Sequence, residues 1–190
     1  MSGSMFDKIL RIDCATKSGV LWDVPETVKS YLGGIGYGTK ILADEVNPAC
    51  DPLSEENKIV LTVGPLTGTM APMHPQSCIV TKSPLSDSIL DCYAGGFLGA
   101  AVKYAGLDGI IFEGRCAEWS VIFIDNGRVS FHSAEPVMGK GTEETEEWMK
   151  ERFGRDAVTS SIGIAGENLV AMASIFSETR TFGRGGAGAV

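Results

Sequence analysis

The spacing of apolar and polar residues predicts short strands and helices in mixed order. Stretches that alternate apolar and polar side chains, or that are almost wholly apolar, are bounded by glycine and proline, as strands commonly are. Other stretches carry apolar residues at helical spacing and end at glycine. We predict strands at residues 5–13, 20–24, 58–63, 77–82, 119–125, 128–132 and 157–162, and helices at residues 25–32, 39–46, 97–104 and 142–153.

The order of these elements indicates an α+β fold. Strands come in pairs joined by turns, of which Asn126-Gly127 is a strong hairpin signal, and they do not alternate strictly with helices. Intertwined antiparallel or mixed sheets therefore suit the pattern better than a doubly wound parallel sheet.

The two halves of the chain are alike in outline. Each begins with a hairpin, continues through a glycine turn into a helix, and reaches a strand that ends in glycine-rich sequence. Short motifs match in the same order, which predicts a duplicated hairpin–helix–strand unit with trimmed loops, at residues 5–106 and 107–190. The matched motifs are Ile12-Asp13 with Ile124-Asp125, Gly36-Tyr37-Gly38-Thr39 with Gly139-Lys140-Gly141-Thr142, more loosely Gly64-Pro65-Leu66-Thr67-Gly68 with Gly163-Ile164-Ala165-Gly166, and Gly95-Gly96 with Gly185-Gly186.

Composition and charge argue against several classes of function. The 190 residues carry a formal net charge of −8, which argues against nucleic acid as a partner because binding its phosphates needs a basic face. No stretch approaches the ~18 consecutive apolar residues of a membrane span, and no secretory signal opens the chain. Five scattered cysteines without a C-x-x-C pair indicate reduced, mostly buried thiols in a cytoplasmic protein. Residues 1–4, ahead of Met5, are either a cloning remnant or a native extension.

Glycine is the compositional outlier, with 24 residues, and two glycine-rich turns indicate anion binding. Gly95-Gly96 leads into the predicted helix at residues 97–104, where free N–H groups and the helix dipole favour a negative charge. Residues 180–190 repeat this pattern and add Arg180 and Arg184, whose guanidinium groups suit phosphate oxygens. Two such cradles imply two anionic groups. The alternative is that the glycines only permit tight turns or close packing.

Other polar motifs give weaker evidence of function. The loose glycine pattern at residues 33–38 lacks the preceding strand of a dinucleotide fingerprint, so we interpret it as a helix-cap turn, with a cofactor role as the alternative. His74 and His132 have no metal-ligand partner at helical spacing, which indicates surface or edge histidines. Lys82 is interpreted as a solvated lysine at a strand end, and the acidic run at residues 143–147 as a solvated helix start.

Seven motifs follow one another in a characteristic order. They are KILRID at residues 8–13, YLGGIG at 31–36, GPLTG at 64–68, VTKSPL at 80–85, AGGF at 94–97, IGIAGEN at 162–168 and GRGGAGAV at 183–190. Together they strongly resemble the N-terminal domain of the tungsten-containing aldehyde ferredoxin oxidoreductase family. The resemblance covers essentially the whole chain from Met5, and the ordered set is far more specific than any single motif.

The resemblance implies an α+β domain, built from a duplicated unit and shaped as a saddle. On it two pterin-dithiolene cofactors hold one tungsten or molybdenum, and magnesium bridges the pterin phosphates. It implies an enzyme that oxidises aldehydes to carboxylic acids and passes electrons to ferredoxin. Later domains of the same protein would supply a [4Fe–4S] cluster and the substrate pocket, so this fragment alone is expected to be inactive. A homodimer remains open.

Site residues carry over from the family position by position. The family's phosphate-binding arginine, five residues before the threonine of Thr-Lys-Ser-Pro, corresponds to Gln76. The asparagine before Ala-Gly-Gly, which gives its carbonyl to magnesium, corresponds to Tyr93, and the resemblance makes the carbonyls of Tyr93 and Thr181 the magnesium ligands. The expected cofactor-binding residues are Gln76, Tyr93, Ala94, Gly95, Gly96, Arg180, Thr181, Gly183, Arg184, Gly185 and Gly186.

Two other functions stay open at this point. One is a stand-alone module that holds a pterin or another phosphate-bearing cofactor for a partner chain. The other is a folded fragment with a degenerate, empty site. An exposed apolar patch, onto which further domains would dock, favours either kind of fragment over a stand-alone module.

Overall fold

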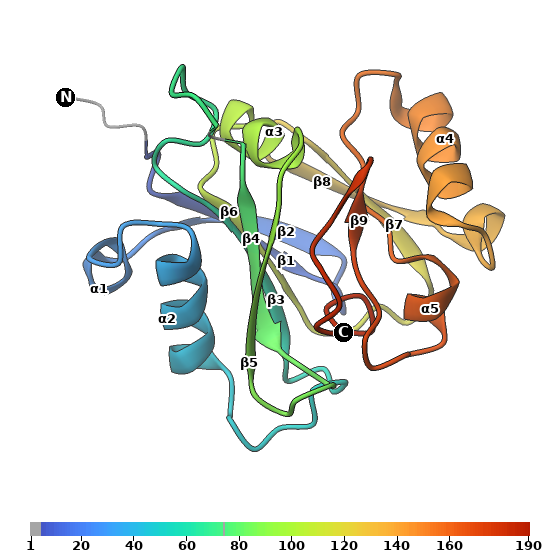
Figure 1. The fold of residues 1–190 in the computed structure, drawn as a ribbon, viewed down its shortest axis with the longest axis horizontal. Coiled ribbons are helices and arrows are strands. Elements are labelled where there is room, and N and C mark those ends of the chain that lie inside the picture. Colours follow the sequence, from blue (N-terminus) through green and yellow to red (C-terminus); the bar gives the residue numbers. More distant parts are fainter. Residues whose placement is uncertain (1–4, 74) are drawn as a thin grey trace.

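The computed structural model describes residues 5–73 and 75–190, and its centre is a six-stranded mixed sheet (Figure 1). Only β1 and β6 run parallel, and every other neighbouring pair is antiparallel. In spatial order the strands are β2 (Ser18–Asp23), β1 (Lys8–Asp13), β6 (Gly109–Glu113), β3 (Lys58–Val63), β4 (Ser77–Lys82) and β5 (Ile89–Ala94).

Different parts of the chain cover the two faces of this sheet. Helices α1 (Glu26–Lys29) and α2 (Ile35–Glu45) lie on one face, whereas α3 (Leu98–Tyr104) and the C-terminal segment lie on the other (Figure 1). Because successive side chains of a strand point to opposite faces, β4 contributes Val80 to the core beneath α2 and Ile79 to the core beneath α3.

The second half adds a separate layer beside the sheet. Its hairpin β7–β8 forms its own two-stranded sheet and packs on β2, where a Cβ placed on Gly19 would lie 2.5 Å from Val129 Cγ2. The elements are β7 (Ser120–Asp125), β8 (Arg128–Ser133), a 3-10 turn at Glu135–Val137, α4 (Thr142–Phe153), α5 (Gly163–Glu167), β9 (Phe176–Ser177) and β10 (Arg180–Thr181).

The predicted α+β class is confirmed, but the internal duplication is not. Both halves contain a hairpin followed by a helix, yet β1–β2 joins the central sheet and β7–β8 does not. The strand predicted at residues 157–162 is wrong. In the described part of the chain that segment makes one bridge, Ser161 to Phe176, and the two-residue strand β9 that contains Phe176 pairs with β10. The boundaries of the pseudo-repeats stay a prediction.

The interpretation of Lys82 as a solvated lysine is wrong. Its side chain is buried, and Nζ donates to the carbonyl oxygens of Pro48 at 2.7 Å and Cys50 at 2.6 Å. It also pairs with the exposed carboxylate of Asp87 at 2.8 Å. Lys82 therefore fastens the loop after α2 to the end of β4, and it is not available to an anion.

The predictions for His132 and for the burial of most cysteines agree with the structure. His132 lies on the edge hairpin β7–β8 as predicted, whereas His74 lies outside the described residues. The cysteines are free thiols, and Cys50, Cys78 and Cys92 are buried, while Cys14 and Cys116 are half-buried. No helix in the described part of the chain is long and apolar enough to cross a membrane.

An ion-pair cluster joins α2 to the sheet and makes stability dependent on pH. Arg11 forks onto Glu45, with Nη1–Oε1 and Nη2–Oε2 distances of 2.9 and 2.6 Å, and Lys58 Nζ lies 2.6 Å from Glu45 Oε2. The hydrogen bonds from Arg11, followed by those from Lys58, lower the pKa of Glu45 from 4.5 to about 2. The stabilisation is therefore present above pH 4.5 and is lost as the pH falls towards 2.

We expect Glu45→Gln to flatten this acid dependence. The variant should be less stable than the wild type at pH 7, and the difference should shrink as the pH falls from 4.5 to 2, because Glu45 is then protonated in the wild type as well. Urea unfolding midpoints across this range measure the effect. Parallel curves for the two proteins would show that Glu45 does not contribute in this way.

Candidate functional site

Two glycine-rich loops meet beyond the end of β5. Gly96 adopts a φ of +90°, and a Cβ placed on it would lie 3.2 Å from Cγ of Arg180 and 3.9 Å from Oε2 of Glu178. The turn after β5 and the loop around β10 are thus in direct contact, although more than 80 residues separate them in the sequence. The structure therefore brings together the two motifs that the sequence singles out for anion binding.

The arginines of this site are exposed and unpaired. Arg180 and Arg184 have exposed side chains, and neither side chain makes an ion pair or hydrogen bond with another described residue. Open space surrounds the positions where Gly95 and Gly183 would carry a Cβ. Unpaired guanidinium groups beside accessible backbone are what an anionic ligand requires.

The arginine-bearing loop is nevertheless held firmly from behind. Phe182 is fully buried in the core beneath α3, and its N–H donates to the carbonyl of Ile175 at 2.9 Å. Ser83 Oγ donates to the carbonyl of Gly185 at 2.6 Å, and Ser174 Oγ donates to that of Gly183. The anchored Phe182 leaves the neighbouring polar groups facing solvent in a fixed loop.

The two glycine cradles differ in their construction. Gly95-Gly96 leads into α3 as predicted. Only four residues of this sequence follow Gly186, so the expected helix after the second cradle stays a prediction. The N–H of Gly188 donates to Ala173 O at 2.9 Å, which holds this segment against the preceding loop. The second cradle also carries Arg180 and Arg184, which the first lacks.

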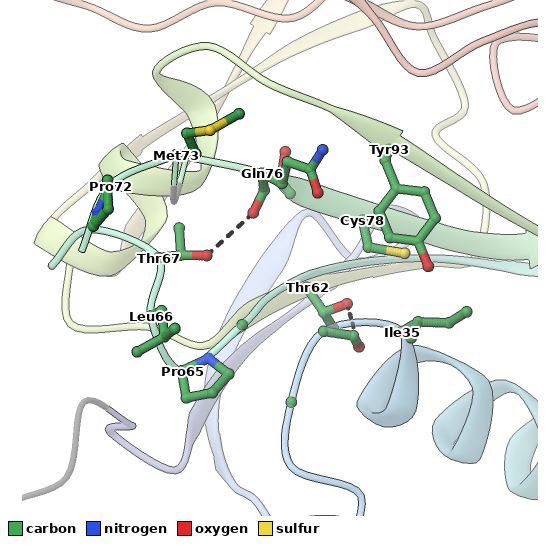
Figure 2. A pocket seen from close by; sticks show the side chains of 14 residues that line it. Ile35, Thr62, Pro65, Leu66, Thr67, Pro72, Met73, Gln76, Cys78 and Tyr93 are labelled. Atoms are coloured by element: carbon green, nitrogen blue, oxygen red, sulfur yellow. Dashed lines mark hydrogen bonds between the residues drawn. The ribbon is translucent and has the colours of Figure 1, made fainter.

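Gln76 and Tyr93 line a separate hollow of about 390 Å³ (Figure 2). The Tyr93 ring lies beside Cys78 in Figure 2, and none of the described lining residues is charged. Tyr93 stands three residues before Gly96, which contacts the arginine-bearing loop, so the hollow and that loop are linked through the end of β5. The other lining residues are Gly33, Gly34, Ile35, Thr62, Gly64, Pro65, Leu66, Thr67, Pro72, Met73 and Ser77.

Most of this lining was not assigned to the site from the sequence. Residues 33–38 were interpreted as a helix-cap turn, and this is confirmed because Gly34 is the N-cap of α2 with a φ of 53°. The same turn also borders the hollow, as does the Gly64–Thr67 loop that follows β3. The proline and glycine of GPLTG marked a turn, but nothing local showed which cavity it lined.

The polar side chains of the hollow are neutral at physiological pH. Burial, with Cys78 and Asp91 nearby, raises the pKa of Tyr93 to about 12. Burial also raises the pKa of the Cys78 thiol to about 12. This part of the site therefore offers an aromatic ring and uncharged hydrogen-bonding groups.

The role of the Tyr93 and Thr181 carbonyls as magnesium ligands stays a prediction. Tyr93 sits on β5 opposite Cys78, and Thr181 sits on β10 opposite Phe176. Within residues 5–73 and 75–190, no three His, Cys, Asp or Glu side chains are grouped to hold a metal ion.

Two glycines of the site should respond differently to alanine. A Cβ on Gly186, whose φ is +93°, would lie 2.3 Å from Ala171 O and 2.8 Å from Pro84 Cδ. We expect Gly186→Ala to lower the free energy of unfolding by about 1–3 kcal/mol, measured by urea denaturation. Gly95→Ala is the matched control, since open space surrounds its Cβ position, and it should change stability by less than about 0.5 kcal/mol. Equal effects would contradict this account of the loop.

Comparison with known proteins places this arrangement in a family. The model of the aldehyde ferredoxin oxidoreductase N-terminal domain matches residues 9–190. The tungsten-containing aldehyde ferredoxin oxidoreductase of Pyrococcus furiosus is 42% identical over 167 residues, covering 87% of this chain and 28% of the relative. The aliphatic sulfonate oxidoreductase WOR-like subunit of the same organism is 33% identical, covering 96% of this chain and 32% of that relative.

A solved structure shows the same fold. The active-site complex BamBC of benzoyl coenzyme A reductase, with 1,5-dienoyl-CoA, superposes with a TM-score of 0.94 at 34% identity, covering 100% of this chain and 29% of that one. The chain thus spans less than a third of the length of these relatives. Sequence and fold agree over nearly its whole extent, and the chain belongs to the aldehyde ferredoxin oxidoreductase N-terminal domain family.

Proposed function

We propose that this chain is the cofactor-cradling domain of an oxidoreductase whose tungsten, or molybdenum, is held between two pterin dithiolenes. The complete protein would oxidise aldehydes to carboxylic acids and pass the electrons to ferredoxin. The observation that carries the proposal is the exposed, unpaired pair Arg180 and Arg184 on a loop that contacts the Gly95-Gly96 turn, in a chain of this family. The catalytic activity belongs to the longer protein, because this chain covers 28% of its aldehyde-oxidising relative.

The residues at the two loops fit a phosphate-bearing cofactor. Arg180 and Arg184 would hold phosphate oxygens, and the open backbone at Gly95 and Gly183 leaves room for the ligand to approach. When bound, the pterin-held metal supplies the two-electron chemistry. The contribution of this chain is to bind and orient the cofactor, from a loop that Phe182 fixes in the core.

The hollow at Gln76 and Tyr93 fits a different part of the same ligand. It offers neutral donors and an aromatic ring, which suit an uncharged heterocycle rather than a second phosphate. Magnesium would be held through the carbonyls of Tyr93 and Thr181, as the family resemblance implies. A [4Fe–4S] cluster in the rest of the protein, ferredoxin as acceptor and a cytoplasmic location belong to the same proposal, and a homodimer stays open.

Exposed apolar side chains favour a domain that the rest of a longer protein covers. Met70 and Met73 are essentially fully exposed, and Leu66 is 61% exposed, all on the loop beside the hollow. A stand-alone pterin-binding module would leave this apolar patch exposed to solvent, which is unfavourable. The patch is equally expected of a domain whose site is degenerate and empty, so only cofactor analysis separates these two functions.

The deciding experiment is metal and pterin analysis of the complete protein from which this chain comes. The proposal expects tungsten or molybdenum with about two pterins per chain. A well-folded complete protein with neither metal nor pterin would overturn it. The replacements at Gln76 and Tyr93 would then mark a site that no longer binds the cofactor.

A further inference from the structure

Two half-buried cysteines meet at the end of the sheet farthest from the cofactor site. Cys14 directly follows β1, and Cys116 lies three residues after the end of β6. These strands are parallel neighbours, with Asp13 opposite Glu113, and the N–H of Cys14 donates to Glu113 O at 2.8 Å. The cofactor hollow lies at the opposite end, where β3 ends at Val63.

The chain turns back so that the segments carrying the two cysteines lie side by side. Gly114 adopts a φ of +70°, and a Cβ on it would lie 3.5 Å from Ala15 Cβ, so the segments after β1 and β6 are closely packed. Cys116 is near enough to Cys14 to raise the pKa of the Cys14 thiol. Arg115 and Ala117, on either side of Cys116, are exposed, which leaves its thiol open to small reagents.

We propose that Cys14 and Cys116 form a redox-active dithiol, a site of reversible disulfide formation with small disulfides as the oxidant. No feature of the proposed function uses this pair, and the proposal stands whether or not a cofactor binds. A disulfide there would join the β1–β2 turn to the segment that connects the central sheet with β7. It would therefore restrain the second half of the chain, which carries Arg180 and Arg184, against the sheet.

The chemistry balances with oxidised glutathione. The thiolate of Cys116 attacks one sulfur of glutathione disulfide, forming a mixed disulfide and releasing one glutathione thiol. Cys14 then displaces the second glutathione, so two protons and two electrons leave the protein in total. Burial and the neighbouring Cys116 raise the pKa of Cys14 to about 12, so Cys14 is the less reactive thiol towards glutathione disulfide. It attacks only the mixed disulfide held next to it and loses its proton in that step.

The other cysteines provide an internal comparison. Cys78 and Cys92 also lie on adjacent strands, but Cys78 is opposite Tyr93 and Cys92 is opposite Ile79. They therefore face opposite sides of the sheet, one in each core cluster, and should not cross-link. Cys50 is buried beneath α2.

The test is oxidation of this chain with oxidised glutathione, followed by alkylation and peptide mapping. We expect the loss of two of the five thiols, a single cross-link between Cys14 and Cys116, and a Tm that rises by several degrees and returns on reduction. Cys14→Ser should trap a glutathione adduct on Cys116, and Cys116→Ser should give neither adduct nor cross-link. Cys50→Ser is the matched control and should cross-link as the wild type does.

Three outcomes would overturn the proposal. They are five unmodified thiols after prolonged oxidation, a cross-link between Cys78 and Cys92 instead, or separate glutathione adducts on Cys14 and Cys116 of the wild type without a cross-link. An adduct on Cys14 in Cys116→Ser would overturn the assignment of Cys116 as the attacking thiol. The decisive result is the oxidation of the wild-type chain, so the test remains valid even where a variant fails to fold.

Discussion

Replacing Asp108 by asparagine is expected to lower the free energy of unfolding by about 3–5 kcal/mol, a large share of the ~5–15 kcal/mol of an ordinary domain. Asp108 is fully buried and Lys103 is 4% exposed, and Oδ1 lies 2.5 Å from Nζ. Asp108 Oδ2 also accepts hydrogen bonds from the N–H groups of Phe6 at 2.8 Å and Asp7 at 2.6 Å. One carboxylate thus joins α3, the start of β6 and the segment that leads into β1.

The expected loss follows from what the substitution leaves behind. Without the carboxylate, the buried ammonium of Lys103 loses its ion pair with Asp108, and the neutral amide cannot replace the charge. Asp23→Asn is the matched control, because Asp23 pairs with Lys8 at the surface, with 82% and 43% of the side chains exposed, and such pairs contribute about 0–1 kcal/mol. Urea denaturation measures both variants. Similar losses would show that burial does not set the strength of the Lys103–Asp108 pair.

Elements defined by local patterns were predictable from the sequence. The apolar run of β3, the Asn126-Gly127 turn of the β7–β8 hairpin and the helix α4 ending before Gly154 depend on neighbouring residues, and all three are confirmed. The glycine turns that bear the candidate site were also recognisable, because Gly-Gly followed by a helix and arginines within a glycine run are visible in the sequence itself.

Elements defined by distant partners were not predictable in the same way. β6 is only five residues long and was not predicted, yet it lies between β1 and β3 because Gly109 permits close approach to Leu61. β5, which ends directly before Gly95-Gly96, was not predicted either. The burial of Lys82 depends on carbonyls more than 30 residues away, and no local pattern reports such a contact.

The candidate site likewise combines residues that could be identified from the sequence with contacts that only the fold creates. Arg180 and Arg184 were identified from sequence, but the contact of Gly96 with Arg180 and the hollow shared by Gln76 and Tyr93 exist only after folding. The structure also shows that the two parts of the site are chemically unequal. One part presents unpaired guanidinium groups, and the other presents neutral groups, so loss of an arginine should affect ligand retention far more than loss of a residue in the hollow.

Arg184→Ala in the complete protein is expected to weaken cofactor retention roughly 10–100-fold, since a hydrogen bond to a charged group contributes about 1.5–3 kcal/mol. Arg184 is exposed and makes no ion pair with the described residues, so its removal leaves no buried partner unsatisfied. The Tm of this chain should therefore stay unchanged. Metal and pterin content of the complete protein measures the first effect, and thermal unfolding of this chain measures the second.

Arg128→Ala is the matched control for this prediction. Arg128 is also an exposed arginine without an ion pair among the described residues, but it opens β8 and is not one of the expected cofactor-binding residues. Its removal makes the same change in net charge, so a general electrostatic effect would lower cofactor content in both variants. Retention lost only in Arg184→Ala assigns the phosphate contact to that residue. Unchanged metal and pterin content in Arg184→Ala would remove Arg184 from the cradle and leave anion binding to Arg180 and the Gly95-Gly96 turn.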